Sequence, residues 1–152
     1  MAKYTIKVKK YSDHIEEIIA AGTITPGHLI VEGSGGTVTV HGTAAGSVIP
    51  CFALEDELQG KAITDNYASG DKVQCWYPYR GDQVYCILAD GEDVAIGDLL
   101  VSAGDGTVAK LVAASAAVAE FALNVVGMAT EAVDMSGSAG ADPDGRIIVR
   151  IV

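Results

Sequence analysis

Hydrophobic and polar residues alternate over short stretches of this chain, and glycine-rich turns separate the stretches. The clearest pattern occurs twice, at residues 26–38 and 96–108, where six positions are identical at a constant offset of 70 residues. The shared apolar positions, such as Leu29 with Val31 and Leu99 with Val101, lie two apart, as one face of a β-strand requires. The sequence therefore predicts two related hairpins.

The same alternation predicts further strands along the chain. Residues 13–21 also fit a helix start, because Asp13 and Glu16 could form a capping box, but a strand is favoured there. Pro50 places the strand around it at an edge or a bulge. The acidic run at 55–57 is interpreted as a solvated helical turn that ends at Gly60. The predicted strands outside the two hairpins lie at residues 3–10, 13–21, 48–54, 72–78, 83–88, 125–134 and 146–152.

Composition supports a mainly β fold. The chain has 152 residues, enough for one domain with a real core, and combines 18 glycines with only 6% aromatic residues. We expect a compact sheet-like or barrel-like domain of short strands and glycine-rich hairpins at residues 13–152. Residues 1–12 are expected to form an extended N-terminal arm or strand. The apolar stretch at 111–129 is too weak for a membrane span and is interpreted as core strands.

The N-terminal strand is amphipathic and cationic. Its apolar positions alternate with polar ones, and four of the ten basic residues of the chain lie there. Such a strand either lies in its own sheet or adds to the sheet edge of a neighbour, where backbone hydrogen bonds supply affinity. Both alternatives stay open at this point. The residues predicted to contact a partner are Lys3, Tyr4, Ile6, Lys7, Val8, Lys9 and Lys10.

Residues 72–78 and 83–88 are predicted to form a hairpin around Arg80 and Gly81. In that register Tyr77 lies opposite Val84, Trp76 opposite Tyr85, and Cys75 opposite Cys86. We expect free thiols, because the chain has three cysteines without metal-ligand spacing. The aromatic residues of this ribbon are predicted to form a core or an oligomer interface, made by Trp76, Tyr77, Tyr79 and Tyr85.

The charge distribution argues against a nucleic-acid partner. The formal net charge is −10, and residues 11–152 carry six basic and all 20 acidic residues. Binding of phosphate groups needs clustered Lys and Arg, which this acidic body lacks. Lysines interrupt any apolar core of a secretory signal at the N-terminus. We therefore expect no direct nucleic-acid contact, no membrane contact and synthesis in a cytosol.

No catalytic or metal-binding motif is evident. His14, His28 and His41 lie far apart without zinc-ligand spacing, and no nucleophile motif occurs. The sequence predicts no enzyme activity, no catalytic residue, no metal and no cofactor.

The order of these signatures resembles the decoration, or cement, proteins of tailed-bacteriophage heads over nearly the whole chain. The resemblance is carried by residues 24–29, 50–55, 58–61, 67–71, 96–102, 104–107 and 129–133. It implies a non-enzymatic virion protein that is made in the bacterial host cytoplasm and forms a homotrimer on the outer surface of the expanded capsid. It also implies the major capsid protein as partner, contacted by the N-terminal arm, and a role in stabilising the head.

Two other functions fit the sequence less well. The pattern around residues 94–100 also resembles β-clip domains that bind carbohydrates, which should have a concave polar pocket. A further alternative is another phage structural module, such as a tail or receptor-binding protein, with the aromatic ribbon around Trp76 exposed.

Overall fold

Short strands joined by tight turns build the protein, which a computed structural model describes for residues 3–10, 13–112, 123–137 and 145–152. The mainly β fold predicted from the sequence is confirmed. A 3-10 turn, η1 (Glu57–Gln59), ends at Gly60, which adopts a left-handed conformation with φ of 70°. The strands are β1 (Lys7–Lys9), β2 (Ile15–Ala20), β3 (Ile30–Glu32), β4 (Thr37–Val40), β5 (Phe52–Ala53), β6 (Lys72–Trp76), β7 (Gln83–Ile87), β8 (Asp93–Val94), β9 (Leu99–Ser102), β10 (Val108–Lys110), β11 (Val125–Ala129), β12 (Val133–Asp134) and β13 (Arg146–Ile151).

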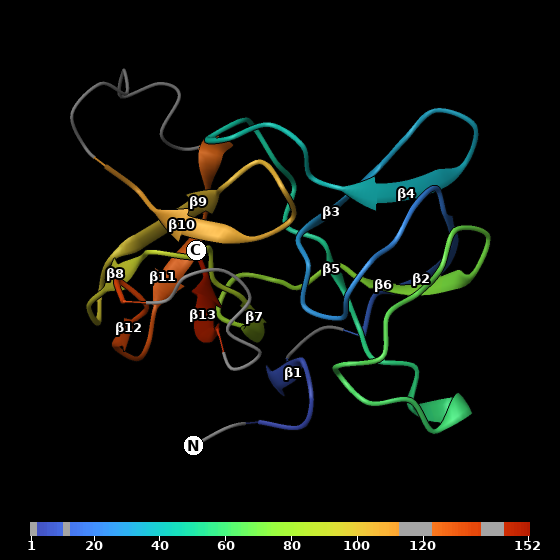
Figure 1. Ribbon diagram of the computed structural model, residues 1–152, viewed down its shortest axis with the longest axis horizontal. Coiled ribbons are helices and arrows are strands. Elements are labelled where there is room, and N and C mark those ends of the chain that lie inside the picture. Colours follow the sequence, from blue (N-terminus) through green and yellow to red (C-terminus); the bar gives the residue numbers. More distant parts are fainter. Residues whose placement is uncertain (1–2, 11–12, 113–122, 138–144) are drawn as a thin grey trace.

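The strands form two main sheets that lie side by side (Figure 1). One sheet has the order β3-β4-β2-β6-β5, and the other has the order β1-β7-β13-β11-β9-β10. Strands β8 and β12 form a separate pair beside the second sheet. We call the part from β2 to β6 the first unit and the part from β7 to β13 the second unit.

The two glycine-rich hairpins are present and share one register. In the first, β3 pairs with β4 so that Ile30 lies opposite Val40. In the second, β9 pairs with β10 so that Leu100 lies opposite Lys110, at the same offset of 70 residues. The turns match as well, since the Gly33 N–H donates to Thr37 O at 2.8 Å and the Ala103 N–H donates to Thr107 O at 3.0 Å. The predicted repeat is therefore a repeat of structure.

This repeat extends over both units. Strand β6 pairs with β2 and β5, and β13 pairs in the same way with β7 and β11. A parallel contact joins β2 to β4 at Ala20 and Val38, and its counterpart joins Leu88 to Val108. Sequence identity alone revealed only the hairpins, because the other strands share their pairing pattern but few side chains.

One hydrophobic core spans the junction of the units. Leu29, Phe52 and Trp76 from the first unit are fully buried and pack in the same cluster as Leu100 and Ile147 from the second unit. A second cluster fills the first unit alone, around Ile24, Ile30 and Val73. The two units are thus joined by buried apolar contacts.

The predicted hairpin between β6 and β7 is wrong. A turn does form, in which the Asp82 carboxylate accepts the Tyr79 N–H at 2.8 Å, but the strands on either side enter different sheets. Both edges of β6 are occupied by β2 and β5, and β7 lies between β1 and β13. Tyr77, Trp76 and Cys75 therefore do not face the residues predicted for them.

The remaining strand predictions are largely confirmed. Residues 13–21 contain β2, and β5 lies at the end of its sheet as Pro50 indicated. The C-terminal strands appear as β11, β12 and β13. Of the predicted core strands at 111–129, residues 113–122 lie outside the described residues, and β11 accounts for the end of the stretch.

Candidate attachment surface

The N-terminal strand lies in the sheet of its own chain. Strand β1 pairs with β7 at the end of the second sheet. The Ile6 side chain is fully buried in the core, its carbonyl accepts the Tyr85 N–H at 2.8 Å, and its own N–H faces the Glu55 carboxylate at 3.1 Å. Of the two alternatives left open by the sequence, the structure has the strand in its own sheet.

This anchoring separates the predicted partner contacts into buried and exposed residues. Ile6 belongs to the core and has no surface to offer in this fold. Tyr4 is 90% exposed, although the alternating pattern had assigned it to the same apolar face as Ile6. Val8 is half-buried. The four lysines lie on β1 or beside it in the chain, and we call this segment the cationic edge. Lys3 and Lys7 are half-buried, and Lys9 and Lys10 are exposed.

Because β1 ends its sheet, the backbone on its outer side faces away from β7. Lys10 forms an ion pair with Asp13, and this contact lowers the pKa of that carboxyl. The cationic edge thus combines an edge strand with positive side chains on an otherwise acidic protein. Such an edge is suited to an acidic segment or an acidic surface of a partner.

Glu55 is the residue that sequence reasoning missed. It was assigned to a solvated acidic turn, yet it is buried, with 5% exposure. Its place directly after the apolar residues 51–54 was the available signal, because a carboxylate there has to find a donor when the run is buried. The donor is the Ile6 N–H, so Glu55 holds the start of the N-terminal strand.

The four aromatic residues predicted to form an interface do not share one surface. Trp76 is fully buried and Tyr85 nearly so, with the Arg146 guanidinium 5.8 Å above the Tyr85 ring. Tyr77 is half-buried and Tyr79 is 63% exposed. Trp76 and Tyr85 therefore belong to the core of this chain, and only Tyr79 is largely exposed.

In the described part of the chain, one open hollow lies between the first unit and Leu123, and another lies on the first unit alone. The larger, of about 480 Å³, is mainly apolar, and within it the Tyr77 hydroxyl donates to the Glu32 carboxylate. Burial, together with this carboxylate, raises the pKa of Tyr77 above its ordinary value. The smaller hollow, of about 310 Å³, is polar and lies beside η1, between Asp56 and Lys72.

The three cysteines are free and buried, as expected. The neighbour of Cys75 is Cys51, however, and not Cys86. The hydrogen bond with the Cys75 thiol, together with burial, raises the pKa of Cys51. Burial raises the pKa of Cys86 to about 12. Cys51 and Cys86 are thus held in unreactive surroundings, whereas the hydrogen bond with Cys51 lowers the pKa of the buried Cys75 thiol.

The histidines serve three separate structural contacts. His14 contacts Glu16 at 2.9 Å, His28 Nδ1 accepts the Thr25 N–H at 3.1 Å, and His41 Nδ1 lies 2.7 Å from Ser102 Oγ. Within the described ranges, no group of three or more His, Cys, Asp or Glu side chains is arranged to hold a metal ion. No helix in those ranges is long and apolar enough to cross a membrane.

Comparison with known proteins identifies a similar fold. No protein-family model matches the sequence, and neither does any curated protein. Among solved structures, the chain is similar to the N base of the head fiber protein gp8.5 of bacteriophage phi29. The two share 18% sequence identity with a TM-score of 0.56, over 91% of this chain and 92% of that one. At this identity, the likeness is one of fold over nearly the full length of both chains.

Proposed function

We propose that this protein is a structural component of a tailed-phage head, bound to the outer surface of the capsid. The observation that carries the proposal is the shared fold with the base of a phage head fiber, over 91% of the chain. The order of sequence motifs, which resembles head decoration proteins, supports the same class independently. We further propose that the protein acts as a homotrimer and stabilises the expanded shell.

The cationic edge is the proposed contact with the major capsid protein. It is the part of this acidic protein where positive side chains gather, since residues 11–152 carry more than three acidic residues for each basic one. The anchor of Ile6 in the core fixes the strand in place, so binding through its lysines carries no cost for ordering the backbone. Three copies of a weak edge, held in one trimer, would bind together much more tightly than one.

Co-sedimentation with mature heads that lack the protein tests this proposal. The variant Lys9→Gln with Lys10→Gln removes two exposed charges from the cationic edge. The variant Lys61→Gln with Arg80→Gln removes the same charge from exposed positions elsewhere. We expect saturable binding of the unchanged protein that weakens with salt, further weakening by the first variant and little change by the second. Absence of binding to the heads would overturn the proposal, and equal effects of both variants would overturn the role of the cationic edge.

The carbohydrate-binding alternative makes a different prediction. The larger hollow is mainly apolar, whereas sugar recognition needs convergent polar groups, so the polar hollow beside η1 is the place to test. A rise in melting temperature with a panel of carbohydrates, lost in Asp56→Ala, would favour that alternative over capsid binding.

A further inference from the structure

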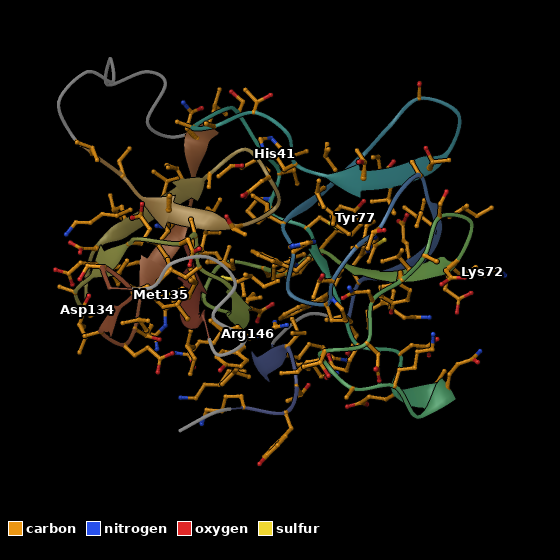
Figure 2. All side chains as sticks on the ribbon, in the orientation of Figure 1. His41, Lys72, Tyr77, Asp134, Met135 and Arg146 are labelled. Atoms are coloured by element: carbon orange, nitrogen blue, oxygen red, sulfur yellow. The ribbon has the colours of Figure 1, made fainter. Side chains whose placement is uncertain are left out.

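The two units of this chain contact each other through different faces. The second unit uses the end of β7 at Ile87, the start of β13 at Arg146 and the turn between β9 and β10 at Gly106. The first unit uses its Gly27 turn and the residues that follow it. The units share one architecture. The first unit therefore also has a copy of the face that the second unit uses, and the second unit has a copy of the face that the first unit uses. Neither copy takes part in the contact within the chain. Figure 2 shows Arg146 and His41 between the units, and Lys72 on the outer side of the first unit.

The internal contact is built from backbone hydrogen bonds. The Ile87 N–H donates to Gly27 O at 3.2 Å, and the Leu29 N–H donates to Gly106 O at 2.7 Å. The Gly106 N–H in turn donates to His41 O at 3.1 Å. Arg146 reaches across with Nη2 and donates to Ile63 O at 2.9 Å. This contact shows which positions would be joined if two copies of the chain contacted each other in the same arrangement.

The first unit repeats the β7 face, but leaves it exposed. The counterpart of Ile87 is Ile19, which is 48% exposed, and four of the five positions from Ile15 to Ile19 are exposed. On β7, four of the five matching positions are buried. Strand β1 lies against Gln83 and Val84 there, and the first unit contacts the strand at Ile87. Lys72 is the counterpart of Arg146: its side chain is 72% exposed, whereas Arg146 is 7% exposed. We call this surface the β2 face.

The turn in the first hairpin is equally open. A Cβ added to Gly106 would lie 2.9 Å from Val40 Cβ, because this turn packs against the first unit. A Cβ added to its counterpart, Gly36, would meet no described atom within 4 Å. The β2 face therefore repeats the strand and the turn of the face used inside the chain. Among the described residues, it has no counterpart of β1 and no packed unit against it.

The second unit repeats the Gly27 face, and it too is open. Gly27 and Pro26 are buried, but their counterparts Gly97 and Ile96 are exposed, Ile96 by 71%. A Cβ added to Gly97 would meet no described atom within 4 Å, whereas at Gly27 it would lie 2.3 Å from Arg146 Nη1. We call this surface the Gly97 face.

The side chains beside the Gly97 turn are also more exposed than their counterparts beside the Gly27 turn. Leu29 and Phe52 are fully buried, whereas their counterparts Leu99 and Met128 are half-buried. Arg150 is the counterpart of Trp76 and is exposed. A contact on the Gly97 face would therefore be more polar than the one inside the chain.

We infer that copies of this chain assemble head to tail, with the β2 face of one copy on the Gly97 face of the next. In this arrangement the Leu99 N–H donates to Gly36 O, as the Leu29 N–H does to Gly106 O inside the chain. Ile19, whose backbone is paired with Thr37 in the single chain, lies beside Gly97 of the next copy. Lys72 takes the place of Arg146, which lies near Glu55, and so approaches Glu131, the counterpart of Glu55. A contact between two different faces closes into a ring when the rotation between copies allows it.

This inference rests on the proposed function only for the number of copies. In a homotrimer, the contact would give a ring of six similar units, alternating between those joined within a chain and those joined between chains. The faces themselves follow from the structure of one chain and are independent of what the ring binds.

Two substitutions test the faces separately. Ile19→Asp disrupts the β2 face and Ile96→Asp disrupts the Gly97 face, while Leu58→Asp on η1 is a matched control at a side chain that is 93% exposed. All three residues are exposed in the single chain, so the variants should fold. We expect the first two to reduce the mass measured by sedimentation velocity to the 15.6 kDa of one chain, and Leu58→Asp to leave the oligomer intact.

Cross-linking then tests whether the contact is head to tail. With a short bis-maleimide, Ile19→Cys mixed with Ile96→Cys should give cross-linked chains, while either variant alone should not exceed the background of the unchanged protein. Cross-linking of Ile19→Cys with itself would reveal a symmetric contact and overturn the inference. Oligomers that persist in both Ile19→Asp and Ile96→Asp would also overturn the inference. The proposed homotrimer would then have to form through other surfaces. A protein that is monomeric at all concentrations but binds heads would overturn the inference and retain the attachment.

Discussion

Removal of the Ile6 side chain should destabilise the whole protein, although the residue lies in what the sequence presented as a peripheral arm. Ile6 is fully buried between the two units and contacts the turn at Gly27, where an added Cβ would lie 3.3 Å from Ile6 Cδ1. Truncation of a buried Ile to Ala leaves a cavity and costs about 2–5 kcal/mol. For a domain of this size, that corresponds to a drop of roughly 4–20 °C in melting temperature.

The assay compares Ile6→Ala with Tyr4→Ala by guanidinium and thermal unfolding. Tyr4 lies two residues away on the same segment but is 90% exposed, so its loss should change stability by no more than about 0.5 kcal/mol. The Glu55 carboxylate offers a second comparison, because Glu55→Gln keeps an acceptor for the Ile6 N–H and Glu55→Ala does not. Glu55→Ala should therefore be the less stable of the two.

The result decides how the N-terminal segment is used. If Ile6→Ala were as stable as Tyr4→Ala, the anchoring of β1 described above would be refuted. The N-terminal segment would then be a free arm that does not contribute to the fold. If Ile6→Ala is destabilised as expected, deletion of residues 1–10 is a poor test of capsid binding, because it damages the fold. Substitutions of Lys9 and Lys10, which are exposed, are then the informative ones.

Three further predictions test other parts of the structure. Gly127→Ala should cost about 1–3 kcal/mol, because the added Cβ would lie 2.6 Å from Arg150 O, whereas Gly22→Ala, with no described atom within 4 Å, should cost much less in the same denaturation assay. Burial holds the pKa of His28 below its ordinary 6.5, so the unfolded chain takes up the proton first. The stability that depends on this group is complete above pH 6.5 and decreases as the pH falls through that value, and melting curves of His28→Asn should lack this part of the decrease. Burial raises the pKa of Cys86 to about 12 from 9.0, so its thiolate fraction near pH 8 should be roughly 1000-fold lower than in the unfolded chain, and peptide mapping after maleimide labelling should find this thiol unmodified until the protein is unfolded.

The fold was predictable from sequence wherever the signal was local. The hairpins of β3 with β4 and β9 with β10 follow from turn glycines and from apolar residues two positions apart, which act within a few residues. The repeat at an offset of 70 was visible because the turns need the same residues in both copies. The 3-10 turn that ends at Gly60 was visible for the same reason.

Long-range pairing was not predictable in this way. Nothing in the local pattern of residues 72–88 shows that β6 and β7 enter different sheets, because that choice depends on β2, β5 and β13. The burial of Glu55 was missed because its donor, the Ile6 N–H, comes from a segment 49 residues earlier. For the same reason the cationic edge could be located by its charge, while the anchor that holds it required the structure.

The most direct test of the central claim is a cryo-electron microscopy reconstruction of mature phage heads to which the purified protein has been added back. The account predicts additional density on the outside of the shell, into which this fold fits, with three copies at each site and the cationic edge of β1 against the capsid. Heads without additional density at saturating protein concentration would contradict attachment to the head. Density in which β1 points away from the shell would contradict the contact proposed here.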